Sequence, residues 1–205
     1  MSSVVLSPEQ RVRFEIECVS GGVPVDVQEH WYRIYADELE HHLEHADHGR
    51  RRLDDPMARA GQLFIARGPS GEVAGTVLTT DRGVGELGYY EDYFDMDQIP
   101  GPASVTTKLT VAPFARRSRV SFMLSRATYA AALERGVEVD FCDCQPSRLH
   151  LFQRMGYRLM PGDGQHPVYG SSLRLRLDVR DIEHLERVGS PFAAVARKRL
   201  RRRAS

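Results

Sequence analysis

The stretch from Val105 to Tyr157 constrains the fold of this 205-residue chain more than any other part. Residues 105–111 are rich in β-branched side chains, which predicts a strand. Apolar residues at helical spacing predict a helix over 117–135, and a second strand is predicted to follow over 137–144. A short helix over 146–155 completes the segment. Strands and helices in this order predict a mixed sheet flanked by helices.

The remaining elements are predicted from side-chain periodicity and from turn residues. Apolar alternation indicates an opening strand with one buried face, and aromatic residues at helical spacing indicate an early helix. Turn residues between two apolar runs indicate a hairpin. The predicted elements are the opening strand 12–18, the helix 27–44, a surface loop around 40–55, the hairpin strands 62–67 and 72–80, the strands 158–160 and 172–179, and a final helix 181–203 with a frayed basic end.

The composition is that of a globular protein, with 41% hydrophobic and 27% charged residues. No stretch approaches the roughly 18 apolar residues that a membrane span needs. Residues 1–10 also lack the basic segment and apolar run of an export signal. We therefore expect a cytoplasmic protein with a single domain over residues 1–196 and a basic tail over 197–205.

The three cysteines, Cys18, Cys142 and Cys144, match neither a disulfide framework nor a zinc site in number or spacing. We interpret them as small buried residues of a protein from a reducing compartment. Four histidines between residues 41 and 48 have acidic neighbours, and a solvated run explains them better than a metal site. No metal ion and no tightly bound cofactor are therefore expected.

The formal net charge of zero hides an asymmetry along the chain. Six of the 28 basic residues lie in 197–203, so the rest of the chain has 22 basic against 28 acidic residues, a net charge of about −6. Such a tail can contact a carrier protein, contact anionic lipid or nucleic acid, or form a disordered solubilising end. Disorder is the expected state, and the acidic body argues against nucleic-acid recognition.

Three segments resemble the GNAT superfamily of acyltransferases. They are Leu109-Thr110-Val111-Ala112-Pro113, Leu133-Glu134-Arg135-Gly136-Val137 and Leu151-Phe152-Gln153-Arg154-Met155-Gly156-Tyr157-Arg158. The resemblance covers roughly residues 60–180. It implies the GNAT fold, an α/β (α+β) domain whose central sheet is mixed but mostly antiparallel and contains a splayed pair of strands. In this family the pantetheine arm of the acyl donor pairs with the exposed strand edge.

The phosphate loop departs from the family pattern. Relatives that use coenzyme A usually carry Gln/Arg-x-x-Gly-x-Gly/Ala, where bare backbone and a helix N-terminus hold the pyrophosphate. The matching residues here are Arg116-Arg117-Ser118-Arg119-Val120-Ser121, without either glycine. Guanidinium and hydroxyl groups suit a single phosphate, so this departure favours a donor carried on acyl carrier protein over coenzyme A. The predicted donor-binding residues are Leu109, Thr110, Val111, Arg116, Arg117, Arg119 and Ser121, and Arg126 and Arg148 are further candidates.

The general acid of many relatives is also missing. Those relatives have a tyrosine at the position of Phe152, five residues before Tyr157, that protonates the leaving thiolate. We interpret Tyr157 as a packing residue, so thiolate departure would rely on water, a backbone N–H or solvent.

The N-terminal part is similar to two branches of the superfamily that use acyl carrier protein, the homoserine-lactone autoinducer synthases and the N-acyl amino acid synthases. Residues 32–39 (Tyr-Arg-Ile-Tyr-Ala-Asp-Glu-Leu) resemble their first-helix pattern, and residues 52–55 (Arg-Leu-Asp-Asp) resemble the acidic pair in the loop that follows. The autoinducer branch has an arginine near Leu78 and a glutamate near Val105, which this chain lacks. The N-acyl amino acid branch therefore fits better.

The same resemblance implies acceptor-binding roles for Arg33, Glu38, Asp54 and Lys108. Lys108 stands where the autoinducer branch has an arginine on its central strand. For Glu38 and Asp54 the alternative is that they are ordinary surface carboxylates.

The predicted chemistry is direct attack of a neutral amine on the thioester carbonyl, which backbone N–H groups at Leu109 and Val111 would polarise. His166, in the loop between the last two strands, titrates in the range that a general base needs. A lone loop histidine is, however, more often simply exposed.

The sequence thus predicts an N-acyltransferase that moves a medium or long acyl chain from acyl carrier protein, or from acyl-coenzyme A, to the amine of a small molecule such as an amino acid. Two alternatives are an acetyl-coenzyme A-dependent N-acetyltransferase and a catalytically inactive GNAT-like domain that binds a partner.

Overall fold

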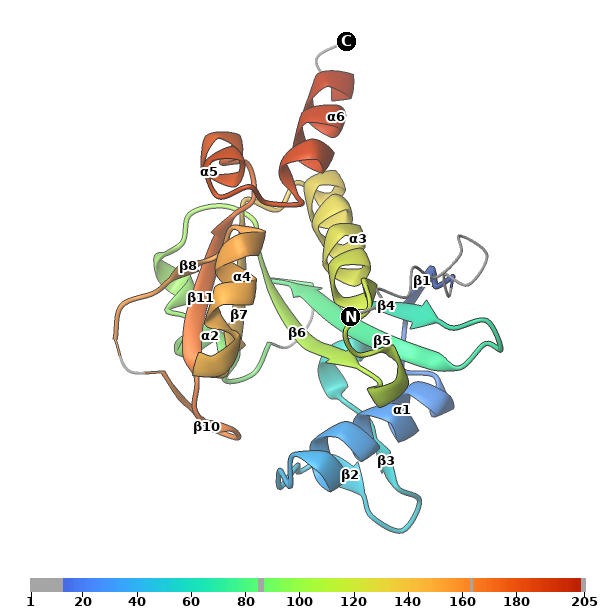
Figure 1. The fold of residues 1–205 in the computed structure, drawn as a ribbon. Helices are drawn as coiled ribbons and strands as arrows, with labels where there is room; N and C mark the ends of the chain where they lie inside the picture. Colours follow the sequence, from blue (N-terminus) through green and yellow to red (C-terminus); the bar gives the residue numbers. More distant parts are fainter. Residues whose placement is uncertain (1–12, 85–86, 163, 204–205) are drawn as a thin grey trace, which may run out of the picture.

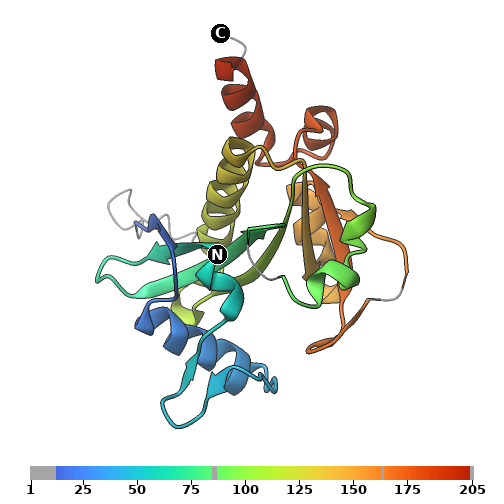
Figure 2. The same cartoon turned by 180° about the vertical axis from the view of Figure 1, so that it is seen from behind.

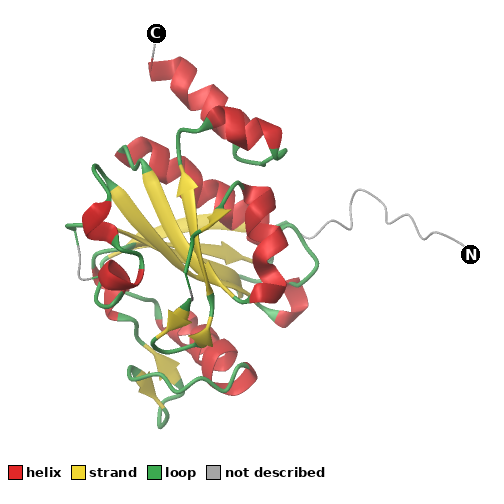
Figure 3. Ribbon diagram, turned by 90° about the vertical axis from the view of Figure 1, so that its left-hand side faces the viewer, coloured by secondary structure: helices red, strands yellow, loops and turns green. Residues whose placement is uncertain are grey.

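A computed structural model describes residues 13–84, 87–162 and 164–203. Its centre is a seven-stranded sheet in the order β1-β4-β5-β6-β7-β11-β8, with helices on both faces (Figures 1 and 3). Only β6 and β7 pair in parallel, and the other neighbours in this sheet are antiparallel. The predicted mixed, mostly antiparallel sheet is confirmed. Its strands are β1 (Glu15–Ser20), β4 (Gln62–Arg67), β5 (Val73–Asp81), β6 (Ala103–Val111), β7 (Val139–Cys144), β8 (Arg158–Leu159) and β11 (Leu173–Asp178).

The helices divide the core into clusters on the two faces of the sheet. Trp31 and Phe94, from the first helix and the segment just after the second, pack with Phe141 of β7 in one cluster. Leu124 and Tyr129, from the long central helix, pack in clusters on the opposite face. The helices are α1 (Val25–Tyr32), which continues as a π-helical turn (Arg33–Glu38), α2 (Tyr90–Tyr93), α3 (Val120–Arg135), α4 (Leu149–Met155), α5 (Ile182–Arg187) and α6 (Ala193–Arg203). None of the described helices is long and apolar enough to cross a membrane.

The first helix and the loop after it differ from the prediction. The helix ends in the π-helical turn, in which Leu39 N donates to Ile34 O at 3.1 Å. Glu40 then adopts a φ of 54°, which stops the helix before the predicted residue 44. The region expected to be an irregular surface loop contains a small hairpin of β2 (Ala46–Asp47) and β3 (Arg52–Leu53).

The C-terminal part also differs, because the single predicted helix is two helices. Gly189 has a φ of 64°, and Pro191 has no N–H to continue a helix, so the chain breaks between α5 and α6. Helix α6 extends to Arg203, as predicted for the end of the final helix, and Arg197 Nε lies 2.6 Å from Glu186 Oε1. Cys18 is exposed, contrary to the prediction that the cysteines are buried, because it lies on the edge strand β1.

The parallel pair β6 and β7 separates halfway along its length. Ala103–Val105 pair with Val139–Phe141. Beyond these residues β6 continues to Val111 and β7 to Cys144, but the two strands no longer pair with each other. Figures 1 and 2 show the two strands diverging from this point. The splayed pair of strands expected from the resemblance is therefore present.

Asp140 stabilises the point at which β6 and β7 separate, which we call the fork. Its carboxylate accepts hydrogen bonds from Ser104 Oγ at 2.5 Å, Thr106 Oγ1 at 2.9 Å and Tyr157 OH at 2.5 Å. Burial raises the pKa of Asp140 to about 6, while these three donors favour the charged form. The carboxylate thus ties β6 and β7 together where their ladder ends.

Strand β6 carries a bulge directly beyond the fork. Thr76 pairs with Thr110 and Leu78 with Thr107, so Val77 faces two residues of β6. One of these is Lys108, whose φ of 53° is unusual for a residue with a side chain. A β-bulge bends its strand and re-aims the side chain, which here turns Lys108 into the protein.

A chain of hydrogen bonds, buried from His30 onwards, fixes this bulge from α1. Arg33 Nη2 donates to His30 Nδ1 (3.3 Å), which leaves the His30 Nε2 proton for Thr110 Oγ1 (2.8 Å). Thr110 then donates to Thr76 Oγ1 (2.8 Å), and Thr76 donates to the Lys108 carbonyl (3.0 Å). Accepting the hydrogen bond from Arg33 at Nδ1 requires a neutral imidazole. Burial, with the Arg33 guanidinium, lowers the pKa of His30 to about 4.

We expect this histidine to make the protein less stable as the pH falls. Between pH 6.5 and 4 the unfolded chain binds a proton at His30 that the folded protein does not, so the free energy of unfolding decreases by up to about 1.4 kcal/mol per pH unit. Urea unfolding of wild type and His30→Gln from pH 7.5 to 5.5 checks this, because contributions from Asp140 and His166 are present in both proteins and cancel. The stability of the variant should fall less steeply; parallel curves would contradict the assignment.

Candidate active site

The splayed strands open into a cleft of about 670 Å³ that joins both faces of the sheet. Its walls are the part of β6 that no longer pairs with β7, the end of β7, the loop before α3, the first turn of α4 and the end of the first helix. The residues that line it include Tyr35, Glu38, Thr106–Val111, Arg116, Arg117, Ser121, Asp143, Arg148, Phe152, Tyr169 and Ser172. The cleft therefore brings together predicted donor-binding and acceptor-binding residues from distant parts of the chain.

The strand edge in this cleft offers free backbone. Ala112 N donates to Ala74 O of β5 at 2.9 Å. Because successive residues of a strand alternate in direction, the N–H of Val111 points away from β5 and towards the cleft. Arg116 Nε donates to the Val111 carbonyl at 3.3 Å on that same side. The geometry fits a strand edge that an extended pantetheine arm can pair with.

The predicted phosphate loop lies at one end of the cleft. Arg117 adopts a φ of 64° and, with Ser121 at the start of α3, lines the cleft. Arg116 also lines it but forms an ion pair with Glu38. Arg119, immediately before α3, does not line it. Arg117 and the N-terminus of the 16-residue helix α3 are thus the best-placed groups for a phosphate.

Lys108 forms a buried ion pair on the opposite side of the cleft. Its Nζ lies 2.7 Å from Asp55 Oδ2, and the two side chains are only 7% and 14% exposed. Burial alone would lower the pKa of Lys108, but the Asp55 carboxylate outweighs it and raises this pKa well above its usual range. The Nζ also lies 5.1 Å from the centroid of the Tyr35 ring. The charge of Lys108 is therefore already balanced within the protein.

Asp143 is a carboxylate that sequence reasoning missed. It lies on β7 just beyond the fork and lines the cleft. Ser172 Oγ donates to its Oδ2 at 2.7 Å. Burial raises the pKa of Asp143, although the Ser172 hydroxyl and the Lys108 ammonium both oppose this rise. The only sequence signal was a charged residue within the apolar run Phe141-Cys142-Asp143-Cys144.

His166 is buried rather than exposed, and both ring nitrogens have partners. Nδ1 accepts hydrogen bonds from Val168 N and Tyr169 N, both at 3.1 Å, so Nε2 carries the proton and lies 3.1 Å from Tyr89 OH. Burial lowers its pKa to about 4, and the Lys108 ammonium contributes to this shift. The ring stacks on Tyr169 at 4.3 Å between centroids and so orients a residue that lines the cleft. A lone pair for proton abstraction is not available in this arrangement.

The other predicted acceptor residues occupy different places. Glu38 lies on the rim of the cleft with Arg116. Arg33 contacts His30 outside the cleft. Asp54 is exposed, and it is the adjacent Asp55 that turns inward to Lys108 and also caps the turn that follows it.

Neither Phe152 nor Tyr157 is placed to act as a general acid in the cleft. Phe152 lines the cleft and carries no proton donor. Tyr157 is buried outside the cleft, and its hydroxyl is committed to Asp140 at 2.5 Å. Arg148 lines the cleft, whereas Arg126 lies in a separate groove on the far side of α3.

Comparisons with known proteins support this architecture. No protein-family model matches the chain, and no curated protein matches it in sequence. The N-acyl amino acid synthase FeeM from uncultured soil microbes superposes with a TM-score of 0.64 and 12% identity, over 89% of this chain and 98% of that protein. The CoA-dependent acyl-homoserine lactone synthase BjaI, with SAM and isopentyl-CoA, gives 0.65 and 16%, over 92% of this chain and 100% of that one.

A GNAT family acetyltransferase from Elizabethkingia anophelis, with acetyl-CoA bound, is more distant. It has a TM-score of 0.50 and 12% identity, over 80% of this chain and 97% of that protein. At such low identities the comparison establishes the fold. The chain has the GNAT fold, in the arrangement seen in N-acyl amino acid and acyl-homoserine lactone synthases.

Proposed function

We propose that the protein is an N-acyltransferase that moves an acyl group from a phosphopantetheine thioester to the amine of a small molecule such as an amino acid. One observation carries the proposal. The cleft between β6 and β7 has a free strand edge and a cationic loop at one side, and a carboxylate on β7 at the other. The thioester and the amine can therefore approach each other from the two faces of the sheet.

In the proposed reaction the amine nitrogen attacks the thioester carbonyl, and the carbon–sulfur bond breaks as the amide bond forms. A main-chain N–H of β6 beyond its pairing with β7, at Leu109 or at Val111, would stabilise the oxyanion. The carboxylate of Asp143 would take the proton that the amine loses, and we assign it the role of general base in place of His166. Water would protonate the departing thiolate, because Phe152 cannot.

Acyl carrier protein is the proposed donor. The loop from Arg116 to Ser121 lacks the glycines that let backbone approach a diphosphate, and Arg116 is already paired with Glu38. What is left is Arg117 beside a helix N-terminus, which suits one phosphodiester. Coenzyme A is the alternative donor, since BjaI, which shares the fold, is CoA-dependent.

Thioester consumption tests the proposal. Purified protein is incubated with C2 to C16 acyl groups on carrier protein and, separately, on coenzyme A, together with pooled amino acids, and N-acyl products are measured by mass spectrometry. Transfer of chains longer than acetyl supports the proposal. Transfer of acetyl alone from coenzyme A would assign the protein to the N-acetyltransferases. No consumption of any thioester would favour a catalytically inactive binding domain.

The phosphate loop provides a matched pair of variants. With acyl-coenzyme A as donor, Arg117→Ala should raise the KM of the donor about tenfold, because a charge-assisted hydrogen bond is lost. Arg119→Ala, two residues away but outside the cleft, should change it less than twofold. Steady-state kinetics at constant acceptor concentration checks this. Equal effects of the two variants would contradict the placement of the phosphate.

A further inference from the structure

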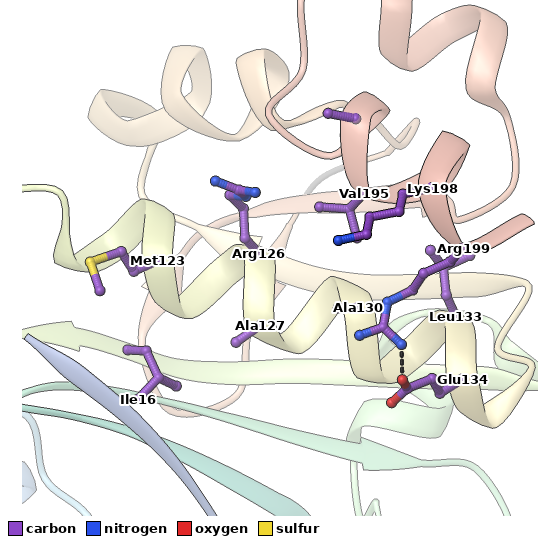
Figure 4. A pocket seen from close by; sticks show the side chains of 11 residues that line it. Ile16, Met123, Arg126, Ala127, Ala130, Leu133, Glu134, Val195, Lys198 and Arg199 are labelled. Atoms are coloured by element: carbon purple, nitrogen blue, oxygen red, sulfur yellow. Dashed lines mark ion pairs between the residues drawn. The ribbon is translucent and has the colours of Figure 1, made fainter. Parts of the chain in front are cut away.

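A second hollow, of about 820 Å³, lies between α3 and α6. Its floor is apolar and consists largely of small side chains, including Ala127 and Ala130 of α3 and Val195 of α6, with Ile16 of β1 along one side (Figure 4). The alanine side chains project little from α3, which leaves space beside α6 at this point. We call this hollow the α3–α6 groove.

Cationic side chains border this apolar floor. Arg126 extends from α3 and Lys198 from α6, while Arg199 forms an ion pair with Glu134 (Figure 4). Within the described part of the chain, no carboxylate lies within ion-pair distance of Arg126 or Lys198, although many other arginines, such as Arg135, have such partners. The groove therefore presents uncompensated positive charge around an apolar surface.

The groove and the donor end of the cleft both border α3, but on different sides of this helix. Arg119, Met123, Arg126 and Ala130 are spaced by four, three and four residues, so they share one face of α3. Arg119 and Arg126 are separated by about 10 Å along the helix axis. This face runs along α3 from Arg119 at its start to the α3–α6 groove, whereas Ser121, which lines the cleft, lies on the opposite face of the helix. A macromolecule that reaches the loop with an extended prosthetic arm can therefore contact the groove with its folded part, on the other side of the same helix.

We propose that the α3–α6 groove is the docking site for an acidic amphipathic helix of the acyl carrier protein that delivers the donor. The inference rests on the proposed function and adds the surface that distinguishes a carrier protein from coenzyme A. Apolar side chains of the helix fill the floor, and its carboxylates face Arg126 and Lys198. Coenzyme A has no polypeptide to occupy this surface.

Binding of apo-carrier protein, which lacks the phosphopantetheine arm, tests the groove independently of catalysis. Calorimetric titration at low salt should show saturable binding that weakens as salt is added, since exposed charges are screened. Arg126→Glu/Lys198→Glu should weaken it at least about tenfold. The control Arg59→Glu/Arg180→Glu makes the same charge change at two exposed residues outside the groove and should leave it within twofold. No binding by the wild type, or equal losses in both variants, would overturn the proposal.

Kinetics with two donors separates docking from chemistry. For one acyl group, Arg126→Glu/Lys198→Glu should lower kcat/KM at least about tenfold with acyl-carrier protein and less than twofold with acyl-coenzyme A. Equal losses with both donors would overturn the docking site. Co-sedimentation with anionic phosphatidylglycerol vesicles that depends on Arg126 and Lys198, without carrier binding, would assign the groove to a membrane surface instead. If neither donor reacts but apo-carrier protein binds in the groove, the proposed function fails and the docking site stands.

Discussion

Asp143→Asn is expected to lower kcat by about 10² to 10³, with the KM of the donor unchanged within twofold. General base catalysis contributes about 10² to 10⁴ in rate, and the proposed mechanism gives that role to the Asp143 carboxylate. Asparagine has nearly the same shape and can still accept the hydrogen bond from Ser172, which lies 2.7 Å away. The variant should therefore fold normally and bind the donor while the transfer step slows.

The pH dependence of the same variant distinguishes a base from a positioning residue. Burial raises the pKa of Asp143 above the ordinary 3.8. In a plot of activity against pH, the wild type should therefore show a rising limb, caused by ionisation of Asp143, at pH values above 3.8. In Asp143→Asn that limb should be absent, and only the ionisation of the acceptor amine should shape the profile. Ser172→Ala serves as the control and should keep the limb, with a rate loss of a few fold. A rate loss below threefold in Asp143→Asn, or an unchanged limb, would refute the assignment.

Lys108→Met should reduce the free energy of unfolding by about 3 to 5 kcal/mol, because it leaves the Asp55 carboxylate without its partner and removing one member of a buried ion pair is strongly destabilising. The side chain of Asp55 is 14% exposed, and the ammonium that would be lost lies 2.7 Å away. Methionine matches the length of the lysine stem and tolerates an irregular cavity, so lost packing contributes little. Urea unfolding at pH 7.5 measures the effect.

The double variant Lys108→Met/Asp55→Asn should regain most of the lost stability, to within about 1 kcal/mol of wild type, because no buried charge is left. The asparagine side chain at this position would still accept the hydrogen bond that Met57 N donates to Asp55 at 3.0 Å. Additive losses in the double variant would contradict the pairing. The same protein also tests the acceptor-binding role predicted for Lys108 from the sequence. A stable double variant with an unchanged acceptor KM would show that the pair is structural.

The strands and helices around the cleft were largely predictable, because their signals are local. The predicted strand 105–111 corresponds to β6 (Ala103–Val111), and the predicted helix 117–135 to α3 (Val120–Arg135). β-Branched side chains, helical spacing and a stop at Gly136 all act within a few residues of each other. The final helix was predicted less well. A single helix was expected over 181–203, whereas the chain breaks at Gly189 and forms α5 and α6.

The site itself depended on contacts that no local pattern contains. The ion pair of Lys108 with Asp55 joins residues far apart in the chain, and nothing in the local pattern tells Asp55, which turns inward and caps the following turn, from Asp54, which is exposed. His166 lies in a loop that looks exposed, yet the tyrosines of α2 and the loop before it bury its ring. Burial then lowers its pKa and removes it as a candidate base.

The sequence by itself determined the order of elements around Val105–Tyr157, the missing glycines of the phosphate loop and the absence of a tyrosine at position 152. These are properties of residues and their spacing. The tertiary structure alone decided that Asp143 faces the cleft, that the charge of Lys108 is balanced by Asp55, and that cationic residues of α3 border a groove beside α6. The reason is physical: desolvation and charge pairing depend on which distant segments pack together, and in this fold the separation of β6 from β7 sets that packing.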